Sequence, residues 1–137
     1  LAVQLEIGSF NTTADMARIY SRARVLVVAA LYEWLGLAAL EAMACGTPVI
    51  GVKQGGLPET IEDGVTGLLV SRTPVALAEA LHKLLIHPEL AEAMGRAGRA
   101  RIESYWTWAR AVDDLEKQFN SVLEENPGTK IGRHVTY

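Results

Sequence analysis

The chain has 137 residues, of which 50% are hydrophobic, and a formal net charge of −3 from 13 basic and 16 acidic side chains. This length and apolar content suffice for one domain with a hydrophobic core, and they exclude intrinsic disorder of the whole chain. The mildly acidic balance argues against a nucleic-acid partner, and no apolar run reaches the roughly 18 residues of a membrane span. The single cysteine allows no internal disulfide and no cysteine-based zinc site.

The first residue is Leu rather than Met, and the chain opens inside an apolar segment without a secretory signal. We therefore expect a cytoplasmic chain that is a fragment, or one whose upstream part is absent from this sequence. Trimming of a few residues is the alternative interpretation.

In the first third of the chain, the hydrophobic pattern predicts strands that alternate with helices. Residues 1–7 alternate apolar and polar side chains, as a strand with one exposed face does, and residues 12–22 have a threonine cap followed by helical spacing. The continuous apolar runs at 25–30 and 48–52 are typical of parallel strands that are buried on both faces. Between them, residues 37–45 predict a helix that Gly46 and Pro48 end.

The rest of the chain predicts further helices around the same sheet. A loop at residues 54–59 opens a short helix, and residues 68–70 form a short strand. Helices are expected at 74–85, 88–103 and 108–124. The fold class is therefore α/β, a parallel sheet flanked by helices, with one partial domain over residues 1–125 and a flexible tail over 126–137.

One helix carries a single charge in an apolar setting. The apolar residues of segment 37–45 surround the helix axis, so the helix is expected to be buried on all sides. A buried carboxylate at Glu41 must be protonated, paired, or turned to a polar cavity. The alternatives are a structural partner, such as an unidentified arginine or a backbone amide, and simple exposure at the helix edge.

The loop before this helix offers a second carboxylate and an anion site. Glu33 lies between a predicted strand and the helix, at the carboxyl edge of the sheet, where ligands of parallel α/β folds bind. Gly36 lets a ligand approach the backbone, and the free N–H groups of the helix start favour phosphate. Lys53, Gly55 and Gly56 follow the neighbouring strand at the same edge, where a solvated lysine and a plain turn are the alternatives.

Three ordered segments together resemble a known family. They are Leu31-Tyr32-Glu33 with Gly36-Leu37, the run from Leu40 to Ile50 (LEAMACGTPVI), and Gly55-Gly56-Leu57-Pro58-Glu59 with the turns and strand up to Val70. This pattern is similar to the group 1 retaining glycosyltransferases and contains their E-x(7)-E signature. The resemblance covers about residues 5–124 and implies the Rossmann-like C-terminal half of a GT-B architecture, incomplete at its N-terminus.

The resemblance also implies roles for individual residues. Glu41 would hold the ribose hydroxyls of a UDP- or GDP-sugar donor, and Glu33 would act as the catalytic residue beside the transferred sugar. The amides of Leu35, Gly36 and Leu37 would contact sugar or phosphate. The donor is a substrate, so no cofactor is expected, and no metal-ligand spacing is present.

The same resemblance implies partners that this chain does not contain. An acceptor domain and a basic pair that neutralises the diphosphate are expected upstream in the same polypeptide, so the fragment alone is expected to be inactive. Many members of the family act at the inner membrane surface through that half, so a peripheral place at the inner membrane face stays open. Trp34 stands where the family has glycine, and together with the missing half it leaves open a non-catalytic Rossmann-like module for protein association. A related sugar-nucleotide epimerase is a third hypothesis.

Overall fold

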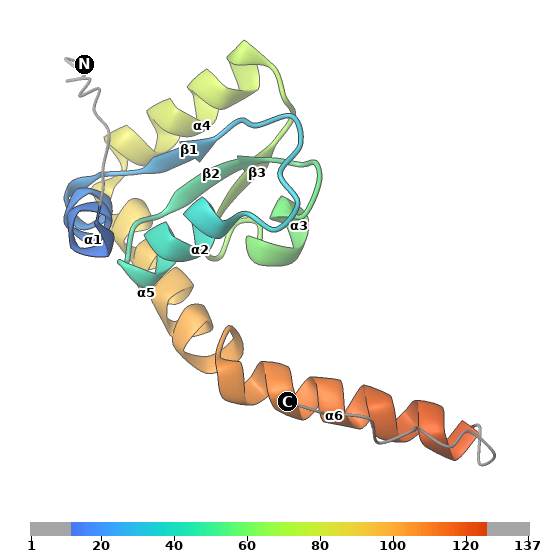
Figure 1. Ribbon diagram of the computed structural model, residues 1–137. Helices are drawn as coiled ribbons and strands as arrows, with labels where there is room; N and C mark the ends of the chain where they lie inside the picture. The colour runs from blue at the N-terminus through green and yellow to red at the C-terminus, as the bar shows by residue number, and fades with distance from the viewer. Residues whose placement is uncertain (1–11, 126–137) are drawn as a thin grey trace. The chain divides into compact units, whose positions relative to one another are not determined.

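The computed structural model describes residues 12–125, and these contain a parallel three-stranded sheet with helices around it (Figure 1). The strands β1 (Leu26–Val28), β2 (Val49–Val52) and β3 (Gly67–Val70) lie in the order β1-β2-β3. Both strand pairs are parallel, with Val27 opposite Ile50 and Ile50 opposite Leu68. The predicted α/β class is therefore confirmed, while the expected strand at 1–7 and tail at 126–137 lie outside the described residues.

The helices begin and end close to the residues that the sequence predicts. They are α1 (Thr13–Arg22), α2 (Leu37–Ala44), α3 (Leu57–Thr60), α4 (Pro74–Ile86), α5 (Pro88–Tyr105) and α6 (Trp108–Glu125). The side chain of Thr12 caps α1 by accepting a hydrogen bond from the N–H of Asp15, and Thr73 caps α4 in the same way. These local signals hold because a capping side chain satisfies an N–H that the helix itself leaves unpaired.

Two hydrophobic clusters divide the core between the two faces of the sheet. The first joins α1, α2 and α3 to the sheet around Met43 and Val49, and the second joins α4 and the start of α5 around Ile50 and Leu84. In Figure 1, α2 and α4 accordingly lie on opposite sides of the strands. This sandwich of helix, sheet and helix places the carboxyl ends of all three strands at one edge.

Strand burial matches the prediction for β2 but not for β1. Every residue of β2 is buried, as its continuous apolar run predicts. The run at 25–30 yields only a three-residue strand, and Val27 is 41% exposed, so the expectation of a strand buried on both faces is wrong for β1. Among the described residues β1 is an edge strand of the sheet, and α4 packs mainly against β2 and β3.

Helix α2 also departs from the prediction, because one of its faces is open. Ala39, Ala42 and Met43 are fully buried, whereas Leu37 is 62% exposed and Glu41 is exposed. Residues 37, 41 and 44 follow one another at helical spacing, so they form a single exposed stripe. Burial on all sides is therefore wrong, and of the alternatives the exposed helix edge is the observed one.

The chain divides into two compact units, Leu1–Ser104 and Tyr105–Tyr137. The first holds the sheet, the helices α1 to α4 and α5 as far as Ser104, while the second holds α6. By itself, α6 carries large apolar side chains that are 49–86% exposed at Trp108, Val112, Leu115, Phe119 and Val122. Within residues 12–125, no helix is both long and apolar enough to cross a membrane.

Candidate functional site

The loop that follows β1 is held against the loop that follows β2 by backbone contacts. The N–H of Gly56 donates to the carbonyl of Glu33 at 2.8 Å. A Cβ at Gly56 would lie 2.0 Å from the carbonyl oxygen of Trp34, and one at Gly55 would lie 2.2 Å from that of Glu33. Both glycines therefore allow a close backbone approach, and Gly55 also has a φ of +60° that disfavours other residues.

Thr60, at the end of α3, was not predicted as a site residue, and its side chain joins the same two loops. Its side chain is fully buried, and its hydroxyl is bonded to the carbonyl of Leu35 at 2.5 Å and to that of Gly56 at 3.2 Å. A buried hydroxyl needs such partners because its desolvation is otherwise uncompensated. Its place one turn after a glycine-proline loop was the available signal.

The carboxylate of Glu33 turns back to the start of α2. Its Oε1 accepts a hydrogen bond from the N–H of Gly36 at 2.9 Å, and Gly36 has a left-handed φ of +80°. Gly36 is buried, and a Cβ there would lie 2.9 Å from Leu57, so packing on α3 also requires glycine. The helix N-terminus at which the sequence predicts an anion site therefore has its Gly36 N–H bonded to a carboxylate of the chain itself, and anion binding there stays a prediction.

A small cavity opens beside Glu33. It has a volume of about 140 Å³ and is lined by Leu31, Tyr32, Glu33, Trp34 and Gly55. The rim is aromatic, since Tyr32 is 80% exposed and Trp34 is 89% exposed. A carboxylate between two exposed aromatic rings is suited to a ligand with hydroxyl groups and an apolar ring face.

Glu41 has a tyrosine as its partner rather than the arginine or amide that the sequence left open. The hydroxyl of Tyr20 donates to Oε2 of Glu41 at 3.1 Å. Burial, the hydrogen bond to Glu41 and the charge of this carboxylate together raise the pKa of Tyr20 from 10 to about 12, and burial is the largest cause. Tyr20 is therefore a neutral donor at ordinary pH, and Glu41 itself is exposed.

Of the remaining predicted site residues, three lie at the Glu33 loop or the start of α2, and Lys53 does not. The backbone of Leu35 and that of Leu37 flank Gly36 at the start of α2, while Gly55 lines the cavity. Lys53 is exposed just past β2, where its N–H extends the sheet by bonding Val70. No contact among residues 12–125 joins its ammonium group to the Glu33 loop, so the structure does not add Lys53 to this cluster.

Known proteins were compared with this chain, and the family model described as "Glycosyl transferases group 1" matches residues 1–101. The chain belongs to this family. D-inositol 3-phosphate glycosyltransferase of Thermobifida fusca is 37% identical over 113 residues, which are 82% of this chain and 26% of the relative. The chain thus spans about a quarter of the length of that relative.

Solved structures support the same fold. Sucrose-phosphate synthase from Thermosynechococcus elongatus aligns with a TM-score of 0.68 and 38% identity over 79% of this chain and 27% of that one. Anabaena HepE in complex with UDP aligns with a TM-score of 0.71 over 79% and 30%, but at 22% identity this likeness concerns the fold alone. The predicted Rossmann-like α/β fold of this group 1 glycosyltransferase chain is therefore confirmed.

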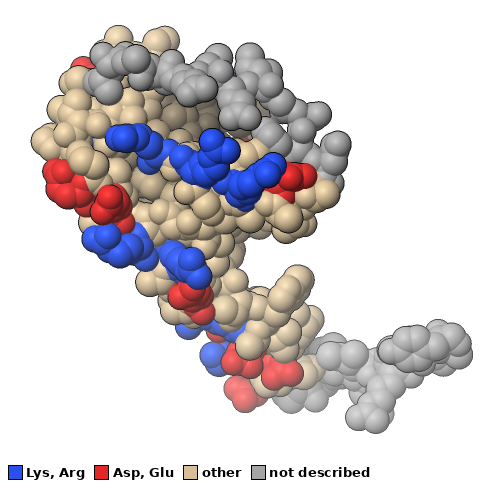
Figure 2. Space-filling model, turned by 90° about the vertical axis from the view of Figure 1, so that its left-hand side faces the viewer, with Lys and Arg blue, Asp and Glu red and all other residues tan. Residues whose placement is uncertain are grey.

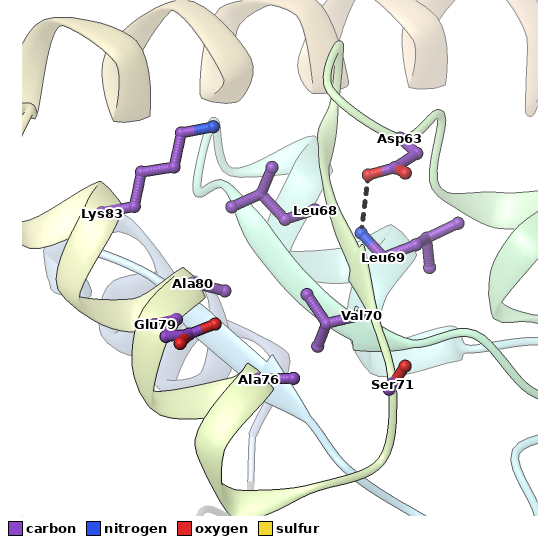
Figure 3. Close-up of a pocket in the computed structure, with 9 residues that line it drawn as sticks. All are labelled: Asp63, Leu68, Leu69, Val70, Ser71, Ala76, Glu79, Ala80 and Lys83. Atoms are coloured by element: carbon purple, nitrogen blue, oxygen red, sulfur yellow. Dashed lines mark hydrogen bonds between the residues drawn. The ribbon is translucent and has the colours of Figure 1, made fainter.

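A larger cavity of the group 1 chain lies away from this cluster, between β3 and α4 (Figure 3). It has a volume of about 360 Å³, its floor includes Leu68, Val70 and Ala80, and Glu79 and Lys83 reach it from α4. Asp63 accepts a hydrogen bond from the N–H of Leu69 there at 2.9 Å. None of the predicted site residues lines this cavity, so size alone does not select it.

Surface charge and metal-binding groups add little to the site. On the face in Figure 2, basic and acidic side chains are both exposed and several lie next to each other. Among the described residues, exposed ion pairs include Arg99–Glu103 on α5, at 2.9 Å. Within the described part of the chain, no three histidine, cysteine, aspartate or glutamate side chains gather as metal ligands would. The chemistry of the site therefore rests on its carboxylates, amides and aromatic rings.

Proposed function

We propose that this chain is the donor-binding domain of a retaining glycosyltransferase, the part of the enzyme that holds a nucleotide diphosphate sugar while the sugar passes to an acceptor. The observation that carries the proposal is the position of Glu41. Its carboxylate lies on the open stripe of α2, one turn from the helix N-terminus, and is held by a neutral donor. An ionised carboxylate in this setting accepts hydrogen bonds from the paired hydroxyls of a ribose.

The spacing along α2 fits such a donor. From Gly36 to Glu41 the helix rises about 7.5 Å, at roughly 1.5 Å per residue. A phosphate at the first amides and a ribose at Glu41 then lie along one stripe of the helix, over the exposed side chain of Leu37. The partial positive charge of the helix N-terminus favours the diphosphate, and the structure of HepE with UDP supports a nucleotide ligand for this fold.

The transferred sugar is proposed to lie in the cavity beside Glu33. In this arrangement the Glu33 carboxylate gives up its hydrogen bond from the Gly36 N–H and accepts one from a sugar hydroxyl instead. That exchange frees the N–H for a phosphate oxygen of the same donor. Trp34, which takes the place of the family glycine, borders this cavity and is proposed to limit which sugars fit.

The transfer itself breaks the bond between the anomeric carbon and the diphosphate while an acceptor hydroxyl forms the new one. Negative charge develops on the leaving diphosphate, so preorganised donors there lower the barrier. The amides of α2 supply part of this stabilisation, and the proposal assigns the remaining cations and the acceptor site to an upstream domain of the same polypeptide.

Calorimetry on the 137-residue chain tests the donor site. UDP, GDP and UDP-glucose are titrated into the wild type, into Glu41→Ala and into the matched control Glu79→Ala, which removes an exposed glutamate from the larger cavity. Loss of hydrogen bonds to a charged group predicts a roughly ten- to hundredfold weaker affinity for Glu41→Ala and no change for Glu79→Ala. Equal affinities in all three proteins, or a loss in Glu79→Ala alone, would refute the assignment.

The second candidate, a module for protein association, is favoured by one feature of α6. The exposed residues Trp108, Val112, Leu115, Phe119 and Val122 are spaced by four and three residues in turn, which is the seam of a pair of packed helices. Sedimentation of the wild type and of Leu115→Glu tests it. Absent nucleotide binding, together with self-association that Leu115→Glu abolishes, would favour this function over the first.

A further inference from the structure

Tyr20 links α1 to Glu41 on α2 and to Thr47, which follows α2. Its ring is 8% exposed and belongs to the core cluster around Met43. Its hydroxyl donates to Oε2 of Glu41 at 3.1 Å, and its backbone carbonyl accepts a hydrogen bond from the buried hydroxyl of Thr47. The phenol is thus fixed by packing on one side and by the backbone on the other, and only its oxygen reaches the exposed carboxylate.

This fixed donor changes what Glu41 can do. A glutamate on an open helix face samples several rotamers, and ordering it on a ligand costs side-chain entropy. A hydrogen bond from a rigid phenol orders the carboxylate before the ligand arrives, which is how preorganisation strengthens binding. It also occupies only part of Oε2, so the other lone pairs of the carboxylate can accept two hydroxyl groups.

We infer that Tyr20 is a positioning residue for the donor site: its hydroxyl holds the Glu41 carboxylate in the orientation that accepts both vicinal hydroxyls of a ribose. The inference rests on the proposed function of Glu41. The inference also predicts a preference for ribose over deoxyribose. A carboxylate held in one orientation accepts hydrogen bonds from both ribose hydroxyls, whereas a deoxyribose lacks one of these donors. The site therefore discriminates a ribonucleotide from its deoxy analogue, and Tyr20 is the origin of much of this discrimination.

The variant Tyr20→Phe removes the hydroxyl and keeps the ring. UDP and 2′-deoxy-UDP are titrated by calorimetry into the wild-type chain, Tyr20→Phe and Glu41→Ala. Tyr20→Phe is expected to bind UDP about five- to tenfold more weakly, while its affinity for 2′-deoxy-UDP changes less than twofold, so the preference for ribose falls. A structural role alone would weaken both ligands equally or neither, and either result overturns the inference.

Thr47→Val is the matched control, because it removes the other hydrogen bond of the same tyrosine without touching the phenol. It is expected to lower the free energy of unfolding and to keep the ratio of UDP to 2′-deoxy-UDP affinity. A ratio that falls as far in Thr47→Val as in Tyr20→Phe would show that loosening α1 is enough, and would overturn the role of the hydroxyl.

The two levels of the argument fail differently. If the wild-type chain does not bind UDP, or Glu41→Ala binds it as well as the wild type, the proposed function falls. If Glu41→Ala loses UDP while Tyr20→Phe keeps wild-type affinity and preference, only the role of Tyr20 falls. Should Tyr20→Phe not fold, Glu41→Gln tests the contact instead: the pKa of Tyr20 is expected to fall below about 12 but to stay above 10, because burial still raises it, and an unchanged pKa overturns the inference.

Discussion

Helix α5 contains two buried glycines three residues apart, and alanine at each of them should have opposite effects on stability. Gly95 faces the turn that ends α2, and a Cβ there would lie 2.0 Å from the carbonyl oxygen of Gly46. Gly98 faces the side chain of Met43, whose nearest atom would lie 3.1 Å away. The first obstacle is backbone and the second is a flexible side chain, so Gly95→Ala and Gly98→Ala form a matched pair.

The magnitude follows from two opposed terms. Alanine in place of glycine stabilises a helix interior by about 1 kcal/mol in either variant. At Gly95 the new contact is about 1.4 Å shorter than the 3.4 Å at which ordinary contact begins, so backbone must move. Overpacking costs roughly 1–3 kcal/mol, and a backbone obstacle places Gly95→Ala at the upper end, so that after the helical gain of about 1 kcal/mol the variant is less stable by about 2 kcal/mol. At Gly98, Met43 needs to give by only a few tenths of an ångström, and the variant should equal or exceed the wild type.

Urea denaturation of the three proteins measures the difference, with a common slope as the check that the same surface is exposed on unfolding. Gly95→Ala should lower the midpoint and Gly98→Ala should keep or raise it. If Gly95→Ala were as stable as Gly98→Ala, the close approach of α5 to Gly46 would be refuted. Because that turn fixes the end of α2, the result also tests how the helix that carries Glu41 is held.

Three further predictions concern a cap, a titration and the site loop. Thr73→Ala removes the cap of α4 and should lower the free energy of unfolding by about 1 kcal/mol in urea denaturation, whereas Ser71→Ala should leave it unchanged. The pKa of Tyr20 is raised from 10 to about 12, so its contribution to stability is complete below pH 10 and is lost as the pH rises through 12. Tyr20→Phe should therefore lose less stability than the wild type between pH 10 and 12, and a parallel loss would contradict the shift. Gly56→Ala would bring a Cβ to 2.0 Å from the carbonyl oxygen of Trp34, so calorimetry should show UDP affinity reduced at least tenfold with the fold retained, and unchanged affinity would contradict the proposed site.

Much of the fold could be predicted because its signals are local. Thr12 caps α1, Gly46 with Pro48 ends α2, and the apolar run at β2 is buried throughout. Each of these depends on a few neighbouring residues whose backbone groups must be paired wherever the segment lies. The loop glycines Gly55 and Gly56 also lie just after β2, at the carboxyl edge of the sheet where the sequence predicts them.

Burial of whole elements could not be predicted in the same way. The wheel of α2 is apolar all round, yet only the face with Ala39, Ala42 and Met43 meets the sheet, and Glu41 lies on the open face. Composition shows which faces could be covered, whereas coverage depends on how many elements surround the helix. The same holds for Val27, which is exposed on a strand that α4 covers less than it covers β2 and β3.

The partners of the two glutamates differ in how accessible they were to reasoning from sequence. Glu33 bonds an N–H only three residues ahead, at a glycine that starts a predicted helix, so spacing alone contained the signal. Tyr20 and Glu41 are 21 residues apart on different helices, and nothing in either helix points to the other. A buried tyrosine requires a partner for its hydroxyl, but only the packing of α1 on α2 identifies it.

The state of these two carboxylates favours a ligand rich in hydroxyl groups. Among the described residues, the ion pairs include neither Glu33 nor Glu41, and each of the two is held by one neutral donor, the Gly36 N–H and the Tyr20 hydroxyl. A cation bound in a salt bridge would take up the remaining lone pairs, whereas a single neutral donor orders the group and leaves acceptor capacity. Carboxylates that are ordered but not neutralised suit donors such as sugar hydroxyls, and the adjacent helix N-terminus suits the phosphate that a nucleotide sugar carries with them.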